Sequence, residues 1–430
     1  MSPDVKIRYI NESEFDEAVL RQGSAVVDFY STECPPCEAL AAKFESLSGT
    51  YGDDIAFFKV FRQENRALAT RLGVTSSPTL LFFKDGSMTG ERLSGGIKRS
   101  EIVHNLDAML PPERIESLRK GMRHVSTECD VLVLGAGPAG LSAGIYTSQA
   151  KLKTIIIDKE LPGGQVKTTH LVSNYPGFSE PISGYMLMHH MAEQAKAAGA
   201  DFRSAVDVTS IDLVRKTIVV DGVETIAAKK IIFATGSSPR FLGIRGEKEY
   251  KGQGVSYCAT CDAKYYEEKD VVVIGGGDSA IEESLFITKF ARTVTVISKY
   301  ATLKANKTAQ EKAYANEKIR FILEHEPREF IKEGIGVKKV IAENLKTGAL
   351  QTIECDGVFI FAGMTPNIGD AKEYFELDQH GYIKTDATAH TNLDDIFAVG
   401  DVASKPFRQI TTAVSDGTIA GITVAQELEE

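Results

Sequence analysis

The chain has 430 residues, 43% of them hydrophobic and 25% charged, so we expect several soluble globular domains rather than one. Its formal net charge of -10 argues against a nucleic-acid partner, because proteins that rely on phosphate contacts usually present a basic face. No apolar stretch reaches the roughly 18 residues of a membrane helix, and the N-terminal residues lack a signal-peptide pattern. We therefore expect a cytoplasmic protein that binds neither nucleic acid nor membrane.

Residues 1–110 alternate short apolar runs with amphipathic segments. This alternation is typical of a small α/β domain. Asp85 and Gly86 lie between two apolar runs and indicate a β-hairpin. The elements expected in this domain are strands at 25–31 and 55–61 with a helix at 36–51 between them, the hairpin, and a closing helix at 98–110.

A C-x-x-C pair, Cys34 and Cys37, lies where the first of these strands gives way to the helix. A thiolate at a helix N-terminus is stabilised by the helix dipole and by free backbone N–H groups, so Cys34 is the expected attacking sulfur. Cys37, one turn further on, is placed to resolve a mixed disulfide. The alternative is half of a zinc site, but no second pair of ligands follows nearby in the sequence.

Residues 111–128 begin with two prolines, are highly charged and contain few apolar residues, which indicates a linker with some helix. Beyond it, two apolar runs that begin at Asp130 and Asp270 each lead into a glycine-rich loop. A strand that runs directly into such a loop is the start of a dinucleotide-binding fold. The sequence therefore predicts two such folds after the N-terminal domain.

The first glycine-rich loop contains Gly135, Gly137 and Gly140 in the G-x-G-x-x-G spacing. The glycines permit a tight turn and bring a pyrophosphate close to the N-terminus of the next helix. Asp158 ends the following apolar run, where its carboxylate can bind ribose hydroxyls. Strand, loop and acid together predict a dinucleotide site.

The second glycine-rich loop has the form G-x-G-x-x-A and follows the apolar run at 270–274. This form is suited to a nicotinamide coenzyme. The residues expected at this site are Gly275, Gly277, Asp278, Ser279 and Ala280.

A second C-x-x-C pair, Cys258 and Cys261, lies just ahead of that loop and is followed directly by Asp262. A zinc site and two core thiols are the alternatives. The neighbouring nucleotide loop and the adjacent acid favour redox exchange, because reactive thiol pairs lie beside cofactors and proton donors.

The N-terminal domain, with Asp28 ahead of its cysteine pair and the run "SSPTLLFF" further on, resembles thioredoxin over residues 5–110. The resemblance implies that Asp28 is the buried acid that exchanges protons with the resolving cysteine. Lys59 matches the usual basic neighbour of this acid. Pro78 matches the cis-proline beside the disulfide, where an X-Pro bond makes the cis form accessible.

The first cysteine pair departs from the thioredoxin pattern at two positions. Thioredoxins usually have W-C-G-P-C, whereas this chain has Glu33 in place of the tryptophan and Pro35 in place of the glycine. Pro35 has no N–H group to offer the Cys34 sulfur, and Glu33 adds a like charge beside a thiolate. Both changes are expected to weaken the acidification of Cys34, so the redox potential and the range of partners stay open.

The C-A-T-C-D run, the two glycine-rich loops and the run "IFAVGDVASKPFRQITTAVSDG" resemble the low-molecular-weight thioredoxin reductases over residues 129–430. The resemblance implies bound FAD, a C-A-T-C disulfide that exchanges electrons with the flavin, and Asp262 as its proton donor. The residues implied for FAD are Gly135, Gly137, Gly140, Asp158, Gly163, Gly164, Gln165, Thr168, Asn174, Gly400, Asp401, Arg408, Gln409 and Ala413.

The choice of coenzyme depends on the end of the next apolar run. Reductases of this family that use NADPH have an H-R-R-x-x-x-R pattern there, and this chain has Ser298, Lys299 and Lys304 at the matching positions. A hydroxyl and two lysines can hold a 2′-phosphate, although the arginine fork is absent. The run "ATLKAN" also resembles the alkyl hydroperoxide reductase flavoprotein, which uses NADH. We favour NADPH and leave NADH open.

The whole chain is similar to a natural fusion of thioredoxin with thioredoxin reductase, an α/β protein with a thioredoxin fold and two Rossmann-like folds. Electrons would pass from NAD(P)H through FAD and the second cysteine pair to the first pair, and then to disulfides of client proteins. Relatives are dimers, so a homodimer is expected. The expected boundaries are 1–110 for the thioredoxin domain, 111–128 for the linker, 129–241 with 369–430 for the FAD domain, and 242–368 for the inserted NAD(P) domain.

Two other functions fit parts of the pattern. A peroxiredoxin (alkyl hydroperoxide) reductase flavoprotein also carries an N-terminal thioredoxin-type module, but that module is a doubled fold and this one is single. A flavoprotein reduced by another donor, or one that acts as a redox-sensing binding module, would explain the missing arginine fork. Reduction of the flavin by NADPH or by NADH would separate these alternatives.

Overall fold

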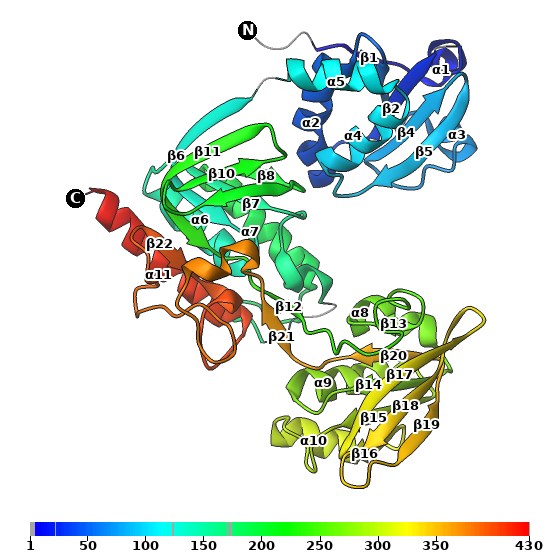
Figure 1. Cartoon of the computed structure of the whole chain (residues 1–430), viewed down its shortest axis with the longest axis vertical. Helices are drawn as coiled ribbons and strands as arrows, with labels where there is room; N and C mark the ends of the chain where they lie inside the picture. The colour runs from blue at the N-terminus through cyan, green and yellow to red at the C-terminus, as the bar shows by residue number, and fades with distance from the viewer. Residues whose placement is uncertain (1–4, 22, 123, 170–171, 173, 430) are drawn as a thin grey trace. The chain divides into compact units, whose positions relative to one another are not determined.

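The structure is a computed structural model that describes residues 5–21, 23–122, 124–169, 172 and 174–429. The side chains of Thr260 and Cys261 lie outside this description. The chain divides into two compact units, which we describe one at a time (Figure 1). The first unit comprises residues 1–164, 188–235 and 368–430, and the second comprises residues 165–187 and 236–367.

In its described residues, the N-terminal part of the first unit is a mixed five-stranded sheet with five helices. These elements are β1 (Ile7–Tyr9), α1 (Glu12–Ala18), β2 (Ser24–Tyr30), α2 (Pro35–Tyr51), β3 (Ala56–Phe61), α3 (Arg66–Arg71), β4 (Thr79–Lys84), β5 (Ser87–Ser94), α4 (Arg99–Ala108) and α5 (Pro112–Gly121). The strand order is β1-β3-β2-β4-β5, and the apolar run of β2 is buried at its centre. Asp85 and Gly86 form the turn between β4 and β5, and both have the positive φ that a two-residue hairpin requires, so the predicted hairpin is confirmed.

Helix α5 occupies most of the segment that was expected to be a linker. Its residue Leu118 is buried in the same hydrophobic cluster as residues of α2 and α4. Arg114 on α5 also pairs with Asp54 over 2.8 Å. Strand β6 (Val125–Leu134) follows almost at once, so only residues 122–124 separate α5 from β6 in the sequence.

The rest of the first unit, which we name the FAD-type fold (residues 125–164, 188–235 and 368–429), is built on a seven-stranded sheet. Its other strands are β7 (Thr154–Asp158), β8 (Asp201–Ser204), β9 (Val208–Asp212), β10 (Thr217–Val220), β11 (Glu224–Phe233) and β22 (Ile396–Ala398). The order is β8-β7-β6-β11-β10-β9, with β22 paired to β11. The strands β8, β7, β6, β11 and β22 pair in parallel, as in a dinucleotide-binding fold.

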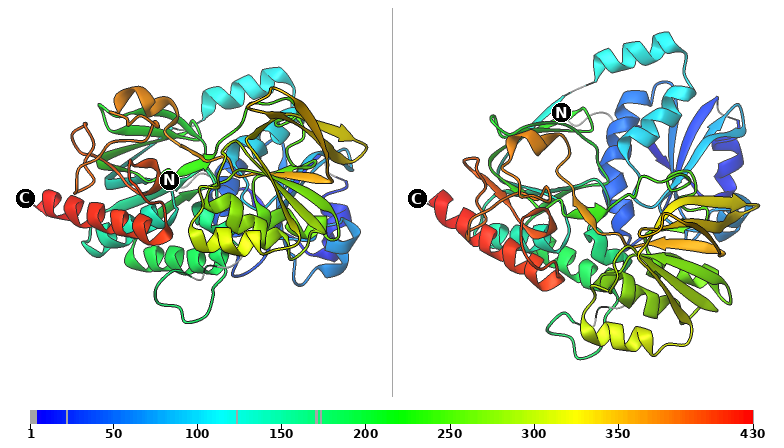
Figure 2. Two further views of the ribbon diagram at one scale, coloured as in Figure 1. Left: turned by 90° about the horizontal axis from the view of Figure 1, so that it is seen from below. Right: turned by 60° about the horizontal axis from the view of Figure 1, so that its bottom comes forward.

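Two helices of the FAD-type fold, α6 (Pro138–Gln149) and α11 (Ile410–Glu429), lie side by side because small residues line their contact (Figures 1 and 2). A Cβ atom on Gly417 would lie 2.1 Å from the Ala139 oxygen. Ser142 Oγ and Thr418 Oγ1 are 2.9 Å apart across the same contact. The remaining helices of this part are η3 (Gly369–Tyr374), η4 (Gly400–Val402) and, from residue 188 on, α7 (Gly184–Ala198), whereas η1 (Gly164–Thr168) lies almost entirely in the second unit.

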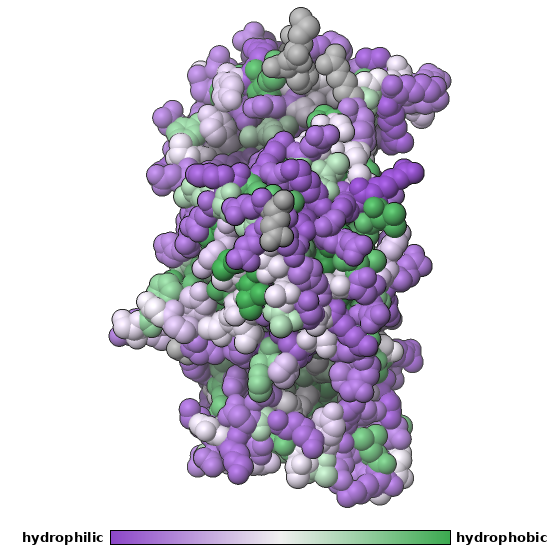
Figure 3. Space-filling model, turned by 90° about the vertical axis from the view of Figure 1, so that its left-hand side faces the viewer, coloured by the Kyte–Doolittle hydropathy of each residue, from purple (hydrophilic) through white to green (hydrophobic). Residues whose placement is uncertain are grey.

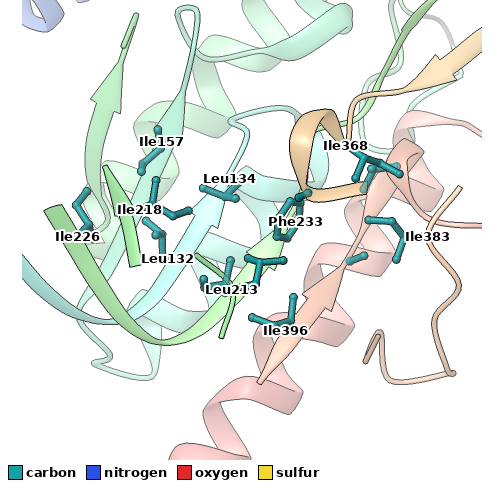
Figure 4. Packing of buried hydrophobic residues seen from close by; sticks show 14 of the residues in the cluster. Leu132, Leu134, Ile157, Leu213, Ile218, Ile226, Phe233, Ile368, Ile383 and Ile396 are labelled. Carbon is teal, nitrogen blue, oxygen red and sulfur yellow. The ribbon is translucent and has the colours of Figure 1, made fainter. Parts of the chain in front are cut away.

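The core of the FAD-type fold joins residues that are far apart in the sequence (Figure 4). Leu132 on β6 and Phe233 on β11 belong to one buried cluster with Ile368, Ile383 and Ile396 from the C-terminal part of the chain. The C-terminal segment therefore completes the fold that begins at β6, and the second unit is inserted between the two parts.

The second unit contains a parallel five-stranded sheet, an antiparallel three-stranded sheet and a two-stranded ribbon. Its elements are β12 (Ser237–Pro239), β13 (Val255–Ser256), α8 (Ala259–Asp262), η2 (Ala263–Tyr266), β14 (Asp270–Ile274), α9 (Asp278–Ile287), β15 (Thr293–Ser298), α10 (Lys307–Tyr314), β16 (Ile319–Leu323), β17 (His325–Glu333), β18 (Gly336–Asn344), β19 (Leu350–Glu354), β20 (Gly357–Ile360) and β21 (Met364–Pro366). The parallel sheet has the order β13-β20-β14-β15-β16. The expected fold class, a thioredoxin fold followed by two Rossmann-like folds, is thus confirmed.

The division into units differs in detail from the expected boundaries. The chain passes between the units at 164–165, 187–188, 235–236 and 367–368. At the last two crossings β12 and β21 pair as an antiparallel ribbon. Residues 165–187, which were expected in the FAD domain, group with the second unit.

The surface is largely hydrophilic on the face shown in Figure 3, with hydrophobic residues interspersed. Among the residues that the structure describes, no helix is both long and apolar enough to cross a membrane.

Candidate functional site

The first cysteine pair forms a disulfide at the start of α2. Cys34 is the N-cap residue and Cys37 lies in the first turn, with 5.2 Å between the two Cα atoms. The Cys37 N–H donates to the Cys34 sulfur over 3.3 Å, whereas Pro35 and Pro36 have no N–H group to offer. The two sulfurs are bonded to each other, as the redox interpretation of this pair requires.

Asp28 lies on β2, the strand that precedes this disulfide in the sequence, and is only 2% exposed. Lys59 Nζ is 3.9 Å from Asp28 Oδ2, and Asp28 Oδ1 accepts no hydrogen bond from any described residue. Burial raises the pKa of Asp28 to about 7, and the charge of Lys59 offsets part of that rise. The carboxyl group can therefore take and return a proton near neutral pH.

The segment before β4 approaches the same disulfide. The peptide bond between Ser77 and Pro78 is cis, as the resemblance to thioredoxin implied, and the Ser77 oxygen is 3.6 Å from Cys34 Sγ. Glu33, in the place of the usual tryptophan, is exposed and has a φ of 50°. The rim of this site is thus charged where thioredoxins usually present an aromatic ring.

In the second cysteine pair, Cys258 lies between β13 and α8, and Cys261 lies within α8. The Cys258 N–H donates to Ser256 Oγ over 3.1 Å, and the Asp262 N–H donates to the Cys258 oxygen over 3.3 Å. These bonds hold Cys258 and Asp262 on one short turn. The Cys261 side chain lies outside the described residues, so its pairing with Cys258 stays a prediction.

Sequence reasoning missed Glu247, a fully buried acid next to the second pair. Its carboxylate accepts hydrogen bonds from the backbone N–H groups of Leu242 (2.9 Å) and Gly243 (2.6 Å) and from the Tyr257 hydroxyl (2.6 Å). Tyr257 directly precedes Cys258, so Glu247 ties the approach to the redox pair to the segment at 242–243. No local sequence pattern predicts that Glu247 is a buried hydrogen-bond acceptor, because its donors come from two separate segments.

The first glycine-rich loop has the shape that a dinucleotide needs. A Cβ atom on Gly135 would lie 2.3 Å from the Ala234 oxygen, and one on Gly140 would lie 1.8 Å from the Gly135 oxygen. At Gly137 the nearest neighbour of such an atom is 3.9 Å away, so this face of the loop is open to a pyrophosphate. Asp158 Oδ2 accepts a hydrogen bond from the Ala136 N–H over 2.7 Å and fixes the loop. The residues present therefore fit a dinucleotide.

The C-terminal part of the predicted FAD site lies around η4 and the start of α11. Gly400 has a φ of 72°, and its N–H donates to Asp416 Oδ2 over 3.0 Å. Burial raises the pKa of Asp401. The Arg408 guanidinium lies over the Tyr382 ring, 3.7 Å from its centroid.

The remaining residues predicted for FAD fall in both units. Gly163, Gly164, Gln409 and Ala413 belong to the first unit, and Gly164 lies against Gly137. Gln165, Thr168 and Asn174 belong to the second unit, so their part in a flavin site stays a prediction.

The second unit contains a cavity of about 810 Å³, large enough for a coenzyme. It brings the second glycine-rich loop, the end of β15 and the first cysteine of the second pair together, as the sequence predicted for the loop and the strand end. The predicted residues that line it are Gln165, Thr168, Cys258, Gly275, Gly277, Asp278, Ser279, Ala280, Ser298, Lys299 and Lys304.

Two lysines and an aromatic ring form one end of this cavity. The Lys299 and Lys304 ammonium groups lie over the Tyr300 ring, 5.6 and 5.4 Å from its centroid. Ser298 is buried, and its Oγ accepts a hydrogen bond from the Tyr300 N–H over 3.3 Å. The charge at this end of the cavity is therefore positive, as a phosphate requires.

Glu283 on α9 also lines the cavity, and sequence reasoning missed it. Burial raises its pKa to about 7, with a further contribution from the neighbouring Glu282. Two adjacent acids on a helix that follows a nucleotide loop are the one signal in the sequence that pointed to this group.

Comparisons with known proteins agree with this geometry. Residues 129–417 match the family described as pyridine nucleotide-disulphide oxidoreductase, and residues 6–108 match the thioredoxin family. The chain is 41% identical over 308 residues to a thioredoxin reductase of Peptoclostridium litorale, which covers 70% of this chain and 97% of that protein. It is 40% identical over 301 residues to a thioredoxin reductase of Bacillus subtilis (strain 168), which covers 70% of this chain and 95% of that protein.

Solved structures give the same result. The crystal structure of Lactococcus lactis thioredoxin reductase superposes with a TM-score of 0.66 at 39% identity, over 69% of this chain and 98% of that chain. The thioredoxin reductase of T. acidophilum superposes with a TM-score of 0.65 at 33% identity, over 70% of this chain and 99% of that chain.

Proposed function

Because the chain belongs to the pyridine nucleotide-disulphide oxidoreductase family, among the thioredoxin reductases, and carries its own thioredoxin domain, we propose that it reduces protein disulfides through two cysteine pairs in series. One observation carries this proposal. The same chain holds a thioredoxin-type disulfide, Cys34–Cys37, and a second pair whose member Cys258 lines the cavity of the coenzyme loop.

FAD, when bound, takes a hydride from the nicotinamide coenzyme and supplies two electrons to the second cysteine pair. The chain would hold its pyrophosphate at Gly135, Gly137 and Gly140, where the loop is open. Asp158 would contribute by fixing that loop. Asp262, on the turn that carries Cys258, is the proposed proton donor to the second pair.

The transfer between the two pairs is a thiol–disulfide exchange. One thiolate of the reduced Cys258–Cys261 pair attacks Cys34 Sγ, which forms a mixed disulfide and releases Cys37 as the leaving thiolate. The second thiol of the pair, as a thiolate, then attacks the sulfur of its own pair in the mixed disulfide, which regenerates the Cys258–Cys261 disulfide and releases Cys34 as a thiolate. Asp28, with a pKa of about 7, supplies the proton that Cys37 takes up. The reduced thioredoxin domain then reduces a client disulfide by the same two steps.

We propose NADPH as the preferred coenzyme, with NADH as the alternative. The two ammonium groups beside Tyr300 support this choice, because a 2′-phosphate would be the only anionic group that distinguishes the two coenzymes at the strand end. Ser298 offers a hydroxyl where coenzymes without that phosphate usually meet an acid.

Removal of the second pair tests the proposed route. The double variant Cys258→Ser/Cys261→Ser is expected to keep FAD and the bleaching of its absorbance by coenzyme, and to lose reduction of insulin disulfides. Cys355→Ala, which changes a buried cysteine outside both pairs, is the matched control and should keep all three. Insulin reduction at the wild-type rate in the double variant would contradict the proposal.

Stopped-flow bleaching of the flavin by NADPH and then by NADH tests the coenzyme. Faster bleaching by NADPH supports our choice, and faster bleaching by NADH reverses it. Bleaching by neither would favour a flavoprotein that another donor reduces.

We also propose that the chain is a homodimer and works in the cytoplasm, where thiol pairs stay reduced. Exposed Tyr146 on α6 and exposed Ile419 and Ile422 on α11 support the dimer, since they form an apolar face on two adjacent helices. Light scattering after size exclusion would measure the mass directly.

A further inference from the structure

A lysine of the thioredoxin fold is buried against the FAD-type fold. Lys43 on α2 is 8% exposed. Its ammonium group donates to the backbone oxygens of Ile97 (3.0 Å), Ser204 (2.8 Å) and Ala205 (2.6 Å). An ammonium group has three donors, so all three are used. Two of the three acceptors belong to the other fold, one at the last residue of β8 and one in the loop that follows it.

A carboxylate in the same loop is bonded on both oxygens by the thioredoxin fold. Asp207 Oδ1 accepts from Lys98 Nζ over 2.6 Å, and Asp207 Oδ2 accepts from Ser100 Oγ over 2.5 Å. The Asp207 N–H donates to Asp221 Oδ1 over 2.8 Å, so Asp221 fixes the backbone of this loop. We name residues 204–207 the docking loop.

Two further contacts extend this surface along the thioredoxin fold. Lys196 Nζ on α7 is 3.1 Å from Glu38 Oε2 in the first turn of α2. Gly96 lies so close to the FAD-type fold that a Cβ atom on it would be 3.1 Å from Leu161 Cγ. The contact therefore runs from the first turn of α2 to the N-terminus of α4.

The charges on the two sides of the docking loop are complementary. Lys43, Lys98 and the buried Arg99 belong to the thioredoxin fold, and Asp207 and Asp221 belong to the FAD-type fold. Burial lowers the pKa of Lys43 to about 8, and the nearby carboxylates of Asp221 and Asp207 oppose that shift. Contacts made of charged and polar groups can separate with little loss, because water replaces the partners of each group. This composition is typical of a reversible interface rather than a permanent one.

We propose that the docking loop is a binding site for the thioredoxin fold of the chain, with Lys43 as the central contact, and that this fold leaves the site when it exchanges disulfides. Glu38 directly follows Cys37, so the contact reaches the turn that carries the disulfide. Release of the contact frees the surface around that turn for another protein. The inference concerns an interaction that needs neither coenzyme nor client, so it goes beyond the proposed function.

The chemical reactivity of the Lys43 amine tests the proposal on the full chain. An N-hydroxysuccinimide ester labels exposed amines, and peptide mass spectrometry gives the labelling rate of each lysine. Asp207→Lys is expected to raise the labelling rate of Lys43 by about fivefold or more, because it replaces a bonded carboxylate by a like charge. Lys98→Asp is expected to act in the same direction.

The charge swap separates docking from general loosening of the fold. The double variant Lys98→Asp/Asp207→Lys restores opposite charges and is expected to return the labelling rate to within about twofold of the wild type. Asp53→Lys reverses an exposed pair, Lys6–Asp53, inside the thioredoxin fold and should leave Lys43 unchanged. Equal labelling of Lys43 in the wild type and in Asp207→Lys would overturn the proposal, and so would an increase in Asp53→Lys or no recovery in the double variant.

Discussion

The chain contains one local arrangement twice, a strand that runs through a glycine-rich loop into a helix, and the two copies differ in what surrounds the helix. In the first copy α6 is covered by α11, and the motif ends on Gly140, where no side chain fits. In the second copy the motif ends on Ala280, and α9 places Glu283 at a cavity. The position that corresponds to Glu283 in the first copy is Ala143, which is fully buried.

The residue that ends the second strand also differs between the copies. Asp158 accepts a hydrogen bond from the Ala136 N–H and so belongs to the loop. Ser298 instead accepts from the Tyr300 N–H, in the segment that carries the two lysines. The shared spacing thus predicts a nucleotide in both copies, whereas the packing around each helix and strand end distinguishes the two ligands.

The largest expected effect comes from adding a side chain to the last glycine of the first loop. Gly140→Ala would place a Cβ atom 1.8 Å from the Gly135 oxygen, and no side-chain rotation relieves an overlap with backbone. We expect a cost of more than about 3 kcal/mol and loss of bound FAD from the purified protein. The matching change in the second copy, Ala280→Gly, should cost only about 1 kcal/mol, the difference in helix propensity. Equal flavin content in the two variants would contradict the assignment of FAD to the first loop alone.

The strand-end acid gives the next effect. Asp158→Ala removes the carboxylate that accepts from the Ala136 and Glu160 N–H groups. Each such bond to a charged group contributes about 1.5 to 3 kcal/mol, so the Kd for FAD is expected to rise by at least about tenfold. Ser298→Ala should leave FAD binding unchanged. Titration of the apoprotein with FAD measures the Kd of both variants. A rise in the Kd for FAD in Ser298→Ala would contradict the assignment of different ligands to the two strand ends.

The second copy has a titratable side chain, Glu283, at the position where the first copy has Ala143. The folded state raises the pKa of Glu283 to about 7, above its ordinary value, so its contribution to stability is complete at low pH and is lost as pH rises through about 7. We expect the second unit to lose about 1 to 3 kcal/mol of stability between pH 5 and pH 8 from this group. Glu283→Gln should remove that dependence in calorimetric scans. An unchanged pH profile in this variant would assign the titration to another group.

The smallest expected effect identifies which coenzyme the second copy binds. Lys299→Ala is expected to raise the KM for NADPH by about tenfold, the loss of one charged hydrogen bond of about 1.5 kcal/mol, and to leave the KM for NADH unchanged. Lys318→Ala, which removes a lysine from the same unit outside the cavity, is the control. If Lys299→Ala raised both KM values equally, the lysine would not bind the 2′-phosphate.

Features with short sequence spacing were the ones that the sequence predicted well. Both glycine-rich loops, the turn at Asp85 and Gly86 and the pair at Cys34 and Cys37 depend on residues within one or two turns of each other. The helix α5 was underestimated, because its charged residues conceal one buried apolar position, Leu118. Its stability comes from packing on the thioredoxin core, which local propensity does not reveal.

Glu247 is a buried polar residue that the sequence pattern would place on the surface. An acid followed by lysine and glutamate reads as a solvated surface segment, yet Glu247 is fully buried. Its four hydrogen-bond donors come from the backbone at 242–244 and from Tyr257, and only the folded chain brings them together. Polar groups whose partners lie in separate segments cannot be recognised without the structure.

The connection at 122–124 limits how the first disulfide can travel. Three residues span at most about 10 Å even when fully extended, so a thioredoxin fold that leaves the docking loop would turn about a short pivot and would not diffuse on a long tether. The thiols that Cys34 meets inside the molecule are then determined by the arc of this rotation and not by local concentration. Residues inserted into the pivot would widen the arc. The rate at which the two cysteine pairs meet would then depend on their effective concentration and no longer on the orientation of the thioredoxin fold.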